Sequence, residues 1–384
     1  MRIAIALLAV GLHCIPSTGS AQTAGPRLVR LTKPDHILGV DFSHVAGVSE
    51  LPDGRVLVSD RVEERVVAAD LATGRTVQVG RAGSGPGEYR MPSRLVRWRG
   101  DSTLLVDEGN GRLAVIAPDL RITRSFTLQL PGLPTTSAPR ALDRQGRLYF
   151  QVPRWAAASF GRHGDSVPVL RLTEPENKVE VITWVLVAAD PPGQRQYGLP
   201  FVPYSPQDVW GVTPTGQLAV ARSGDYHVEW LVDGRLTRGP HVAYRSTPVT
   251  HDDKIRYVRH FLENSGIGGR GGQGGSPTGM TPVPSEMTSQ SSLERLATRN
   301  TFARTKPPFT DDAPFLSPDG QFWVHRSGPN GADFDWDVFD GQGRLVSRVS
   351  LPAGRALVAV GGGGVYAVVS DENGVERLER YPAR

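Results

Sequence analysis

The sequence contains very little cysteine and lysine, and it has no long apolar run beyond its first residues. Cys14 is the only cysteine among 384 residues. If it leaves with an N-terminal signal, disulfides, thiol catalysis and cysteine-ligated metals are excluded together. Only four of the 43 basic residues are lysines, and the arginines are scattered among 39 acidic residues rather than gathered in a stripe. This pattern argues against a dedicated nucleic-acid-binding protein.

The N-terminus has the pattern of an export signal. A basic residue precedes an apolar run at residues 3–12, which is about half the length that a membrane-spanning helix needs. Gly19 and Ala21 are small residues at the spacing of a cleavage site. We therefore expect a signal peptide over residues 1–21 and export of the mature chain, 22–384, to the periplasm or the extracellular space. No other segment has the pattern of a transmembrane helix.

A turn followed by a short apolar strand recurs along the chain. Glycine or aspartate occupies each turn, and mostly aliphatic or aromatic residues follow it, as in a β-hairpin. The six turns lie at residues 52–55, 99–102, 144–147, 214–217, 318–321 and 361–364. Neighbouring copies without an insertion are 44–47 residues apart. This period is typical of a four-stranded propeller blade, so the sequence predicts an all-β, six-bladed β-propeller.

The sixth copy lacks one strand of its own. A second turn follows the first in five copies, but the chain ends after three strands of the sixth. The segment 27–32, Arg-Leu-Val-Arg-Leu-Thr, has the composition of a strand and precedes the first copy. We therefore expect an N-terminal strand near residues 28–31 to pair with the C-terminal strand and close the last blade, which removes two exposed strand edges.

Residues 250–308 interrupt the repeat between blades four and five. Thr250 can cap a helix that begins at the next residue, with two aspartates in its first turn. Residues 266–279 include eight glycines, which predicts a flexible linker, and a second helix can follow at 285–299. Two interpretations remain open: an insertion that contacts little of the propeller, or a lid over the opening of the ring.

Two segments resemble bacterial exported six-bladed β-propellers of the NHL-repeat-like type. Residues 80–92 read GRAGSGPGEYRMP, like the loop that links two blades in those proteins, and residues 104–113 read LLVDEGNGRL. The resemblance implies the propeller fold over most of the mature chain. It does not specify an activity, because propellers support many unrelated functions. Metal-dependent lactonases are among the enzymes built on six blades.

The candidate site residues come from one class of loop. In a propeller, the loops between the second and third strands of the blades lie on the same face as the links between blades, which we call the top face. Four arginines in or next to such loops are the predicted ligand-binding residues: Arg65, Arg112, Arg222 and Arg326. Converging guanidinium groups bind carboxylates well. The competing interpretation is that each arginine pairs with a nearby acid. His325 also departs from the repeat and is a further candidate.

Catalytic motifs are missing from the sequence. It contains neither a nucleophile elbow nor an HExxH zinc motif. The main functional prediction is therefore an exported, monomeric binding scaffold that holds a peptide, glycan or protein partner at its top face without a cofactor. The alternative is a lactonase-, esterase- or lyase-type enzyme with a cation such as calcium in the central channel. Asp60, Asp107 and Asp371 would then be the metal ligands, because calcium prefers oxygen donors.

Overall fold

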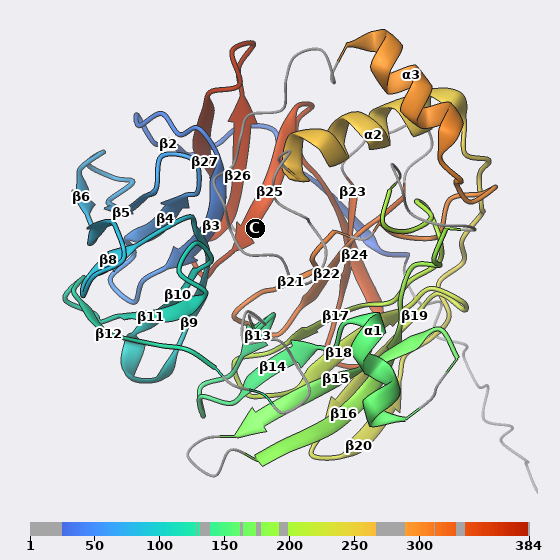
Figure 1. The fold of residues 1–384 in the computed structure, drawn as a ribbon, viewed down its shortest axis with the longest axis horizontal. Helices are drawn as coiled ribbons and strands as arrows, with labels where there is room; N and C mark the ends of the chain where they lie inside the picture. The colour runs from blue at the N-terminus through green and yellow to red at the C-terminus, as the bar shows by residue number, and fades with distance from the viewer. Residues whose placement is uncertain are drawn as a thin grey trace, which may run out of the picture.

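The computed structural model describes residues 25–128, 130, 139–161, 164–173, 178–191, 199–265, 289–310, 312–327 and 335–382. It is a six-bladed β-propeller, as the repeat predicts (Figure 1). The signal peptide and the glycine-rich segment 266–279 were also predicted from the sequence, and both lie outside the described residues.

Each blade is an antiparallel sheet whose strands run in chain order from the inner to the outer edge. The strands of blades one to three are β3 (Val45–Glu50), β4 (Val56–Asp60), β5 (Arg65–Ala69) and β6 (Thr76–Gln78); β9 (Pro92–Arg97), β10 (Thr103–Asp107), β11 (Arg112–Ile116) and β12 (Ile122–Phe126); and β13 (Ala141–Leu142), β14 (Leu148–Gln151), β15 (Ser166–Thr173) and β16 (Lys178–Leu186). A short parallel pair, β7 (Arg81–Ala82) and β8 (Glu88–Tyr89), lies in the link between blades one and two.

The strands of blades four to six continue the pattern. They are β17 (Val209–Val212), β18 (Leu218–Arg222), β19 (His227–Val232) and β20 (Arg235–Arg238); β21 (Phe315–Leu316), β22 (Phe322–His325), β23 (Asp335–Phe339) and β24 (Leu345–Ser350); and β25 (Arg355–Val360), β26 (Gly364–Ser370) and β27 (Glu376–Pro382). The second strands are the most apolar elements, and β4, β10 and β18 are almost entirely buried between neighbouring blades. Packing between blades therefore forms the hydrophobic core.

Four equivalent turns have the same backbone geometry. Gly54, Gly146, Gly216 and Gly320 each occupy the turn between the first and second strands, with φ of +79° to +86°. A side chain is strained in this left-handed region, so glycine fits these positions for a local reason. The backbone N–H of each glycine donates a hydrogen bond to the carbonyl three residues earlier, at 2.9–3.0 Å. These local turns are the feature that made the blades recognisable in the sequence.

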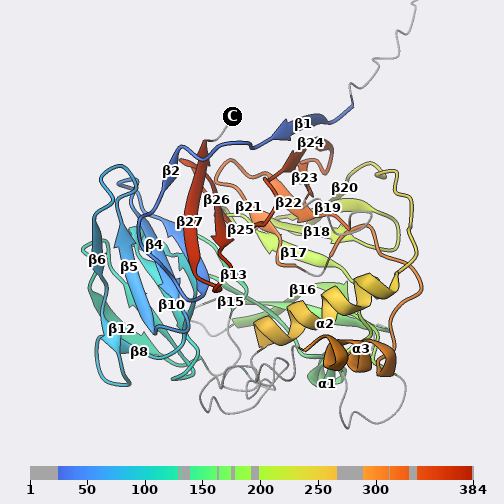
Figure 2. The same ribbon diagram turned by 90° about the horizontal axis from the view of Figure 1, so that it is seen from above.

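An N-terminal strand closes the last blade, but it is not the predicted one. β2 (His36–Ile37) pairs antiparallel with β27 and is the fourth strand of blade six. The expected segment forms β1 (Arg27–Arg30), which instead pairs in parallel with β24 and adds a fifth strand to blade five (Figure 2). The expectation that residues 28–31 pair with the C-terminal strand is therefore wrong. Blades five and six each have an outer edge with which an N-terminal strand pairs. The composition of residues 27–32 does not determine which of the two edges they join.

The insertion between blades four and five contains two helices, α2 (His251–Ser265) and α3 (Gln290–Arg299). Thr250 caps α2 as predicted: its hydroxyl accepts a hydrogen bond from the N–H of Asp253, and the Asp253 carboxylate accepts one from the N–H of Thr250 at 2.9 Å. Figure 2 shows both helices on the same side of the propeller as α1 (Arg154–Ala157), the short helix in the top-face loop of blade three. In the part of the chain that the structure describes, no helix is long and apolar enough to cross a membrane.

Candidate functional site

The six innermost strands form a ring around the axis of the propeller, and we call the region along this axis the central channel. β3, β9, β13, β17, β21 and β25 each lie next to the innermost strand of the following blade, and β25 lies next to β3 (Figure 1). The top face surrounds one end of this channel, because all loops between second and third strands and all links between blades meet there. The site must therefore be sought among the side chains of this face and of the innermost strands.

The helical insertion is docked against the top face. Val258 and Leu262 of α2 pack with Leu293 and Ala297 of α3 and with Leu199, which belongs to the link between blades three and four. Hydrogen bonds fix the same contact: the N–H of Leu199 donates to the Asn300 side chain at 2.8 Å, and the N–H of Ala303 donates to the Pro203 carbonyl at 3.0 Å. These contacts contradict the interpretation of an insertion that contacts little of the propeller, and the lid stays a prediction.

An ionic contact secures the start of α2. The Lys306 ammonium lies 2.8 Å from Asp253 Oδ1, and both side chains are buried. Burial acts to raise the pKa of Asp253, but hydrogen bonds from Lys306 and Thr250 outweigh it and lower the pKa to about 2. The carboxylate therefore stays ionised and holds the base of the insertion at neutral pH.

This contact predicts a local loss of structure in acid. Because the pKa of Asp253 is lower in the folded than in the unfolded chain, its stabilisation is present above about pH 4 and is lost as the pH falls towards about 2. We expect Asp253→Asn to give the same loss at neutral pH, seen as a reduced amide-exchange protection factor in α2. Helix α3 serves as the reference, because the Asp253–Lys306 contact lies at the start of α2. Unchanged protection of α2 in the variant would contradict this prediction.

Two predicted ligand-binding arginines are engaged within the top-face loops. Arg65 donates to the Asp41 carbonyl at 2.7 Å and lies 3.8 Å from Asp60. Arg112 donates to Asp107 at 2.8 Å and also to the carbonyls of Ser84, Gly85 and Glu88 in the glycine-rich loop. Asp60 and Asp107 are nearby acids, so both arginines are paired as the competing interpretation expects.

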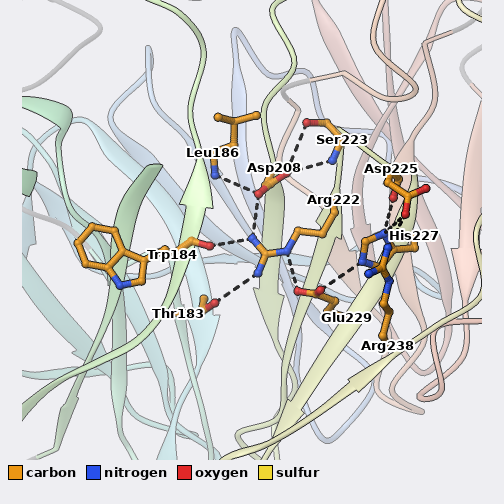
Figure 3. A network of polar contacts seen from close by, with 10 residues as sticks. All are labelled: Thr183, Trp184, Leu186, Asp208, Arg222, Ser223, Asp225, His227, Glu229 and Arg238. Atoms are coloured by element: carbon orange, nitrogen blue, oxygen red, sulfur yellow. Dashed lines mark hydrogen bonds and ion pairs between the residues drawn. The ribbon is translucent and has the colours of Figure 1, made fainter. Parts of the chain in front are cut away.

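Arg222 lies at the centre of a network between blades three and four (Figure 3). It donates to Asp208 at 2.9 Å and to Glu229 at 2.7 Å, and to the Trp184 carbonyl of blade three at 2.7 Å. Burial acts to lower the pKa of Arg222, but its hydrogen bonds to the two carboxylates raise it. Burial likewise acts to raise the pKa of Glu229, and hydrogen bonds from Arg222 and His227 lower it. The network is thus a desolvated set of mutually stabilised charges.

Arg326 belongs to a comparable cluster around Asp337. Its Nε lies 3.4 Å from Asp337 Oδ1, and Arg348 donates to the same oxygen at 3.0 Å. The Tyr226 hydroxyl of blade four donates to the other carboxylate oxygen at 2.7 Å. Burial raises the pKa of Asp337 despite these contacts. As with Arg222, the predicted ligand-binding arginine is in contact with a buried acid.

The three predicted metal ligands are each used within their own loops. Asp60 accepts from the N–H groups of Ser43, Val62 and Glu63, and Asp371 accepts from those of Asn373 and Val375. Asp107 accepts from the N–H of Arg90 and the side chains of Asn110 and Arg112. Among the described residues, no group of three or more histidine, aspartate or glutamate side chains could hold a metal ion. Because each carboxylate is used within its own loop, these three residues do not fit a shared calcium site. The bound cation stays a prediction, and the described residues supply no set of ligands for it.

Two arginines of the innermost strands were missed from the sequence. Arg94 lies in β9, and Arg140 immediately precedes β13, where its N–H continues the strand pairing by donating to the Tyr149 carbonyl at 2.8 Å. The Arg94 side chain is half-buried and the Arg140 side chain is exposed. The candidate residues were sought in loops, so these two arginines at the innermost strands were not considered. The available signal was an arginine inside a buried inner strand, between Ser93 and Leu95.

A second charged cluster lies beside the end of blade five. His325 at the end of β22 contacts Asp312 through Nδ1 at 2.5 Å, and its ring stacks on Trp336 with centroids 4.8 Å apart. Burial acts to raise the pKa of Asp312, but the hydrogen bond from His325 outweighs it, and the charge of His260 in α2 lowers the pKa further. The insertion therefore reaches this cluster. His325, a candidate from the sequence, is placed here.

Comparison with known proteins finds distant similarity to solved structures. The sequence matches no family model and no curated protein. Among solved structures, a gluconolactonase of Xanthomonas campestris is 13% identical over 94% of this chain and 99% of its own, with a TM-score of 0.44. Virginiamycin B lyase of Staphylococcus aureus is 11% identical over 92% and 88%, with a TM-score of 0.39. A protein of Bacteroides fragilis described as exported is 10% identical over 93% and 94%, with a TM-score of 0.48. At these identities the likeness concerns the fold alone.

Proposed function

We propose that this protein is an exported binding scaffold that holds its ligand at the top-face end of the central channel, beneath the α2–α3 insertion. The observation that carries the proposal is the docking of the insertion on the link between blades three and four, with α2 reaching the Asp312 cluster. A helical pair at this position would partly cover a ligand held at the top face, and ligands are usually bound in concave, partly covered spaces.

The competing enzyme proposal has less support. The residues predicted to hold a cation are hydrogen-bonded within their own loops, and the described part of the chain offers no metal-ligand group. The fold itself does not decide between binding and catalysis, because the propeller supports both. Binding is therefore the function that we carry forward.

Removal of the insertion tests the proposal. Val249 donates to the Arg304 carbonyl at 3.0 Å and Pro248 is paired with Thr305, so residues 250–303 can be replaced by a two-residue turn. Lys306→Met removes the buried ammonium that would lose its partner Asp253. We expect the shortened protein to unfold cooperatively, as a propeller, but to lose the affinity of the intact protein for those peptides, glycans or small acids that raise its melting temperature.

The matched control keeps the insertion and carries Lys306→Met alone, which removes the same ammonium while Asp253 keeps its contacts with Thr250 and Arg256. It should retain ligand binding. Calcium-dependent hydrolysis of lactones or aryl esters by the intact protein, abolished by a chelator, would reject the binding scaffold in favour of the enzyme. Equal ligand affinity with and without the insertion would reject its role as a cover.

A further inference from the structure

We propose that Arg94 and Arg140 form an anion-binding site in the wall of the central channel, which takes a ligand bearing carboxylate or phosphate oxygens. This inference rests on the proposed function in placing the ligand at the channel, and it names the chemical class of that ligand. It does not depend on the insertion or on the four arginines predicted from the sequence.

The two arginines belong to neighbouring blades, and the charge of Arg94 acts on Arg140. β9 and β13 are the innermost strands of blades two and three, and they contact each other. Arg94 alternates with the buried residues Ser93 and Leu95, while Arg140 is exposed at the start of its strand. Because innermost strands lie nearest the propeller axis, we place the two side chains at the wall of the channel.

Neither guanidinium has a neutralising partner. In the described ranges, no hydrogen bond or ion pair joins either side chain to another residue. The acid whose charge acts on Arg94 is Glu108, but that carboxylate is paired with Arg61 at 2.7 Å. By contrast, Arg65, Arg112, Arg222 and Arg326 each have a carboxylate within 4 Å. The channel pair therefore differs from the four arginines that were predicted from the sequence to bind the ligand.

The electrostatics agree with this placement. Burial lowers the pKa of Arg140 to about 10, and the neighbouring positive charge of Arg94 adds to the effect. Burial also lowers the pKa of Arg94. Both groups nevertheless remain protonated at neutral pH, so two like charges are held together at a partly desolvated position. Such an arrangement is unfavourable in the free protein and favourable once an anion lies between the charges.

The geometry of the guanidinium group indicates the ligand. Its planar set of N–H donors matches the oxygen pairs of carboxylates and phosphates, and two such groups suit a ligand with at least two anionic oxygens. Unfavourable local arrangements of this kind are expected at functional sites, where binding offsets them. Succinate and inorganic phosphate are the simplest probes of the two ligand sources.

Calorimetric titration of the full-length mature protein at low ionic strength tests the site. We expect saturable binding of phosphate or succinate that weakens with added sodium chloride, and at least a tenfold loss of affinity in Arg94→Gln and in Arg140→Gln. Arg97→Gln is the matched control, since it changes the same strand at an exposed ion pair with Asp101. Tighter binding of phosphate would indicate a phosphorylated ligand, and tighter binding of succinate a carboxylate.

Thermal unfolding without any probe gives an independent readout. Because the two charges repel each other, the double variant Arg94→Gln/Arg140→Gln should melt at the same temperature as the wild type or higher. A structural pair of arginines would give a lower melting temperature. Absence of saturable binding of both probes, or binding that both variants retain, would overturn the site. Binding that survives removal of residues 250–303 would support this site while rejecting the covering role of the insertion.

Discussion

Replacement of Arg222 by alanine should strongly destabilise the propeller. The guanidinium is the donor to two buried carboxylates, and the side chains of Asp208 and Glu229 are only 6% and 14% exposed. Its removal leaves these charges without a partner in a desolvated place and breaks the contact with the Trp184 carbonyl of blade three. Loss of one member of a buried ionic network costs about 3–5 kcal/mol. We expect a melting temperature several degrees lower, measured by calorimetry.

The pH dependence of this loss carries further information. Hydrogen bonds hold the pKa of Glu229 below its ordinary value, so its stabilisation is present above about pH 4 and disappears as the pH falls through the lowered value. In the variant, Glu229 lacks the hydrogen bond from Arg222 and takes up a proton at higher pH. The difference in stability between wild type and variant should therefore shrink in acid.

Controls separate this role from ligand binding. Arg97→Ala removes an exposed pair 3.6 Å from Asp101 and should cost less than about 1 kcal/mol. Adding Asp208→Asn and Glu229→Gln to the Arg222 variant should restore part of the lost stability, because the charges left unpaired are then absent. An unchanged melting temperature together with weaker ligand binding would instead support the original prediction that Arg222 is a ligand-binding residue.

The sequence predicted the blades because their turns are determined locally. Gly54 and its equivalents need a positive φ within four residues of chain, and the strands that follow bury their apolar side chains against the next blade. The same reasoning found the cap at Thr250. Features that depend on residues close together in the chain were therefore accessible without a structure.

The partners of the arginines were less accessible when they came from other elements. Asp107 lies five residues from Arg112, and that pair was foreseen as the competing interpretation. Asp208, by contrast, precedes blade four, and Asp337 lies on the third strand of blade five. Arg94 and Arg140 are 46 residues apart in the chain and become neighbours only through blade packing. The sequence of one loop does not show which residues of other blades lie next to it in the folded protein.

Truncation of the N-terminus should separate the two N-terminal strands by the size of their effects. Deletion of residues 22–33 removes β1, which adds an outer strand to blade five through four residue pairs with β24. Deletion of residues 22–39 also removes β2 and with it the closure of blade six. We expect a modest fall in melting temperature for the shorter deletion and loss of cooperative unfolding for the longer one.

The physical reason is that β2 connects the two ends of the ring. The N–H groups of Asp35 and Leu38 donate to the carbonyls of Arg380 and Leu378 at 2.9 Å, and the Asp35 carboxylate accepts two hydrogen bonds from Arg380 at 3.0–3.1 Å. Without them, β27 loses its fourth-strand partner, and backbone pairing between the two ends of the ring is reduced to the Phe42–Glu376 bridge. β1 stabilises a blade that is already complete, so its loss leaves the ring closed.

A matched pair of point variants tests the same distinction without shortening the chain. Leu38 follows β2 and is 1% exposed within the core shared by blades one and six, whereas Leu28 in β1 is 57% exposed. Leu38→Ala should cost about 2–5 kcal/mol, as for other buried leucines. Leu28→Ala should change the stability by less than about 0.5 kcal/mol. Equal effects of the two variants, or of the two deletions, would show that closure of the ring does not depend on β2 and would return that role to residues 28–31.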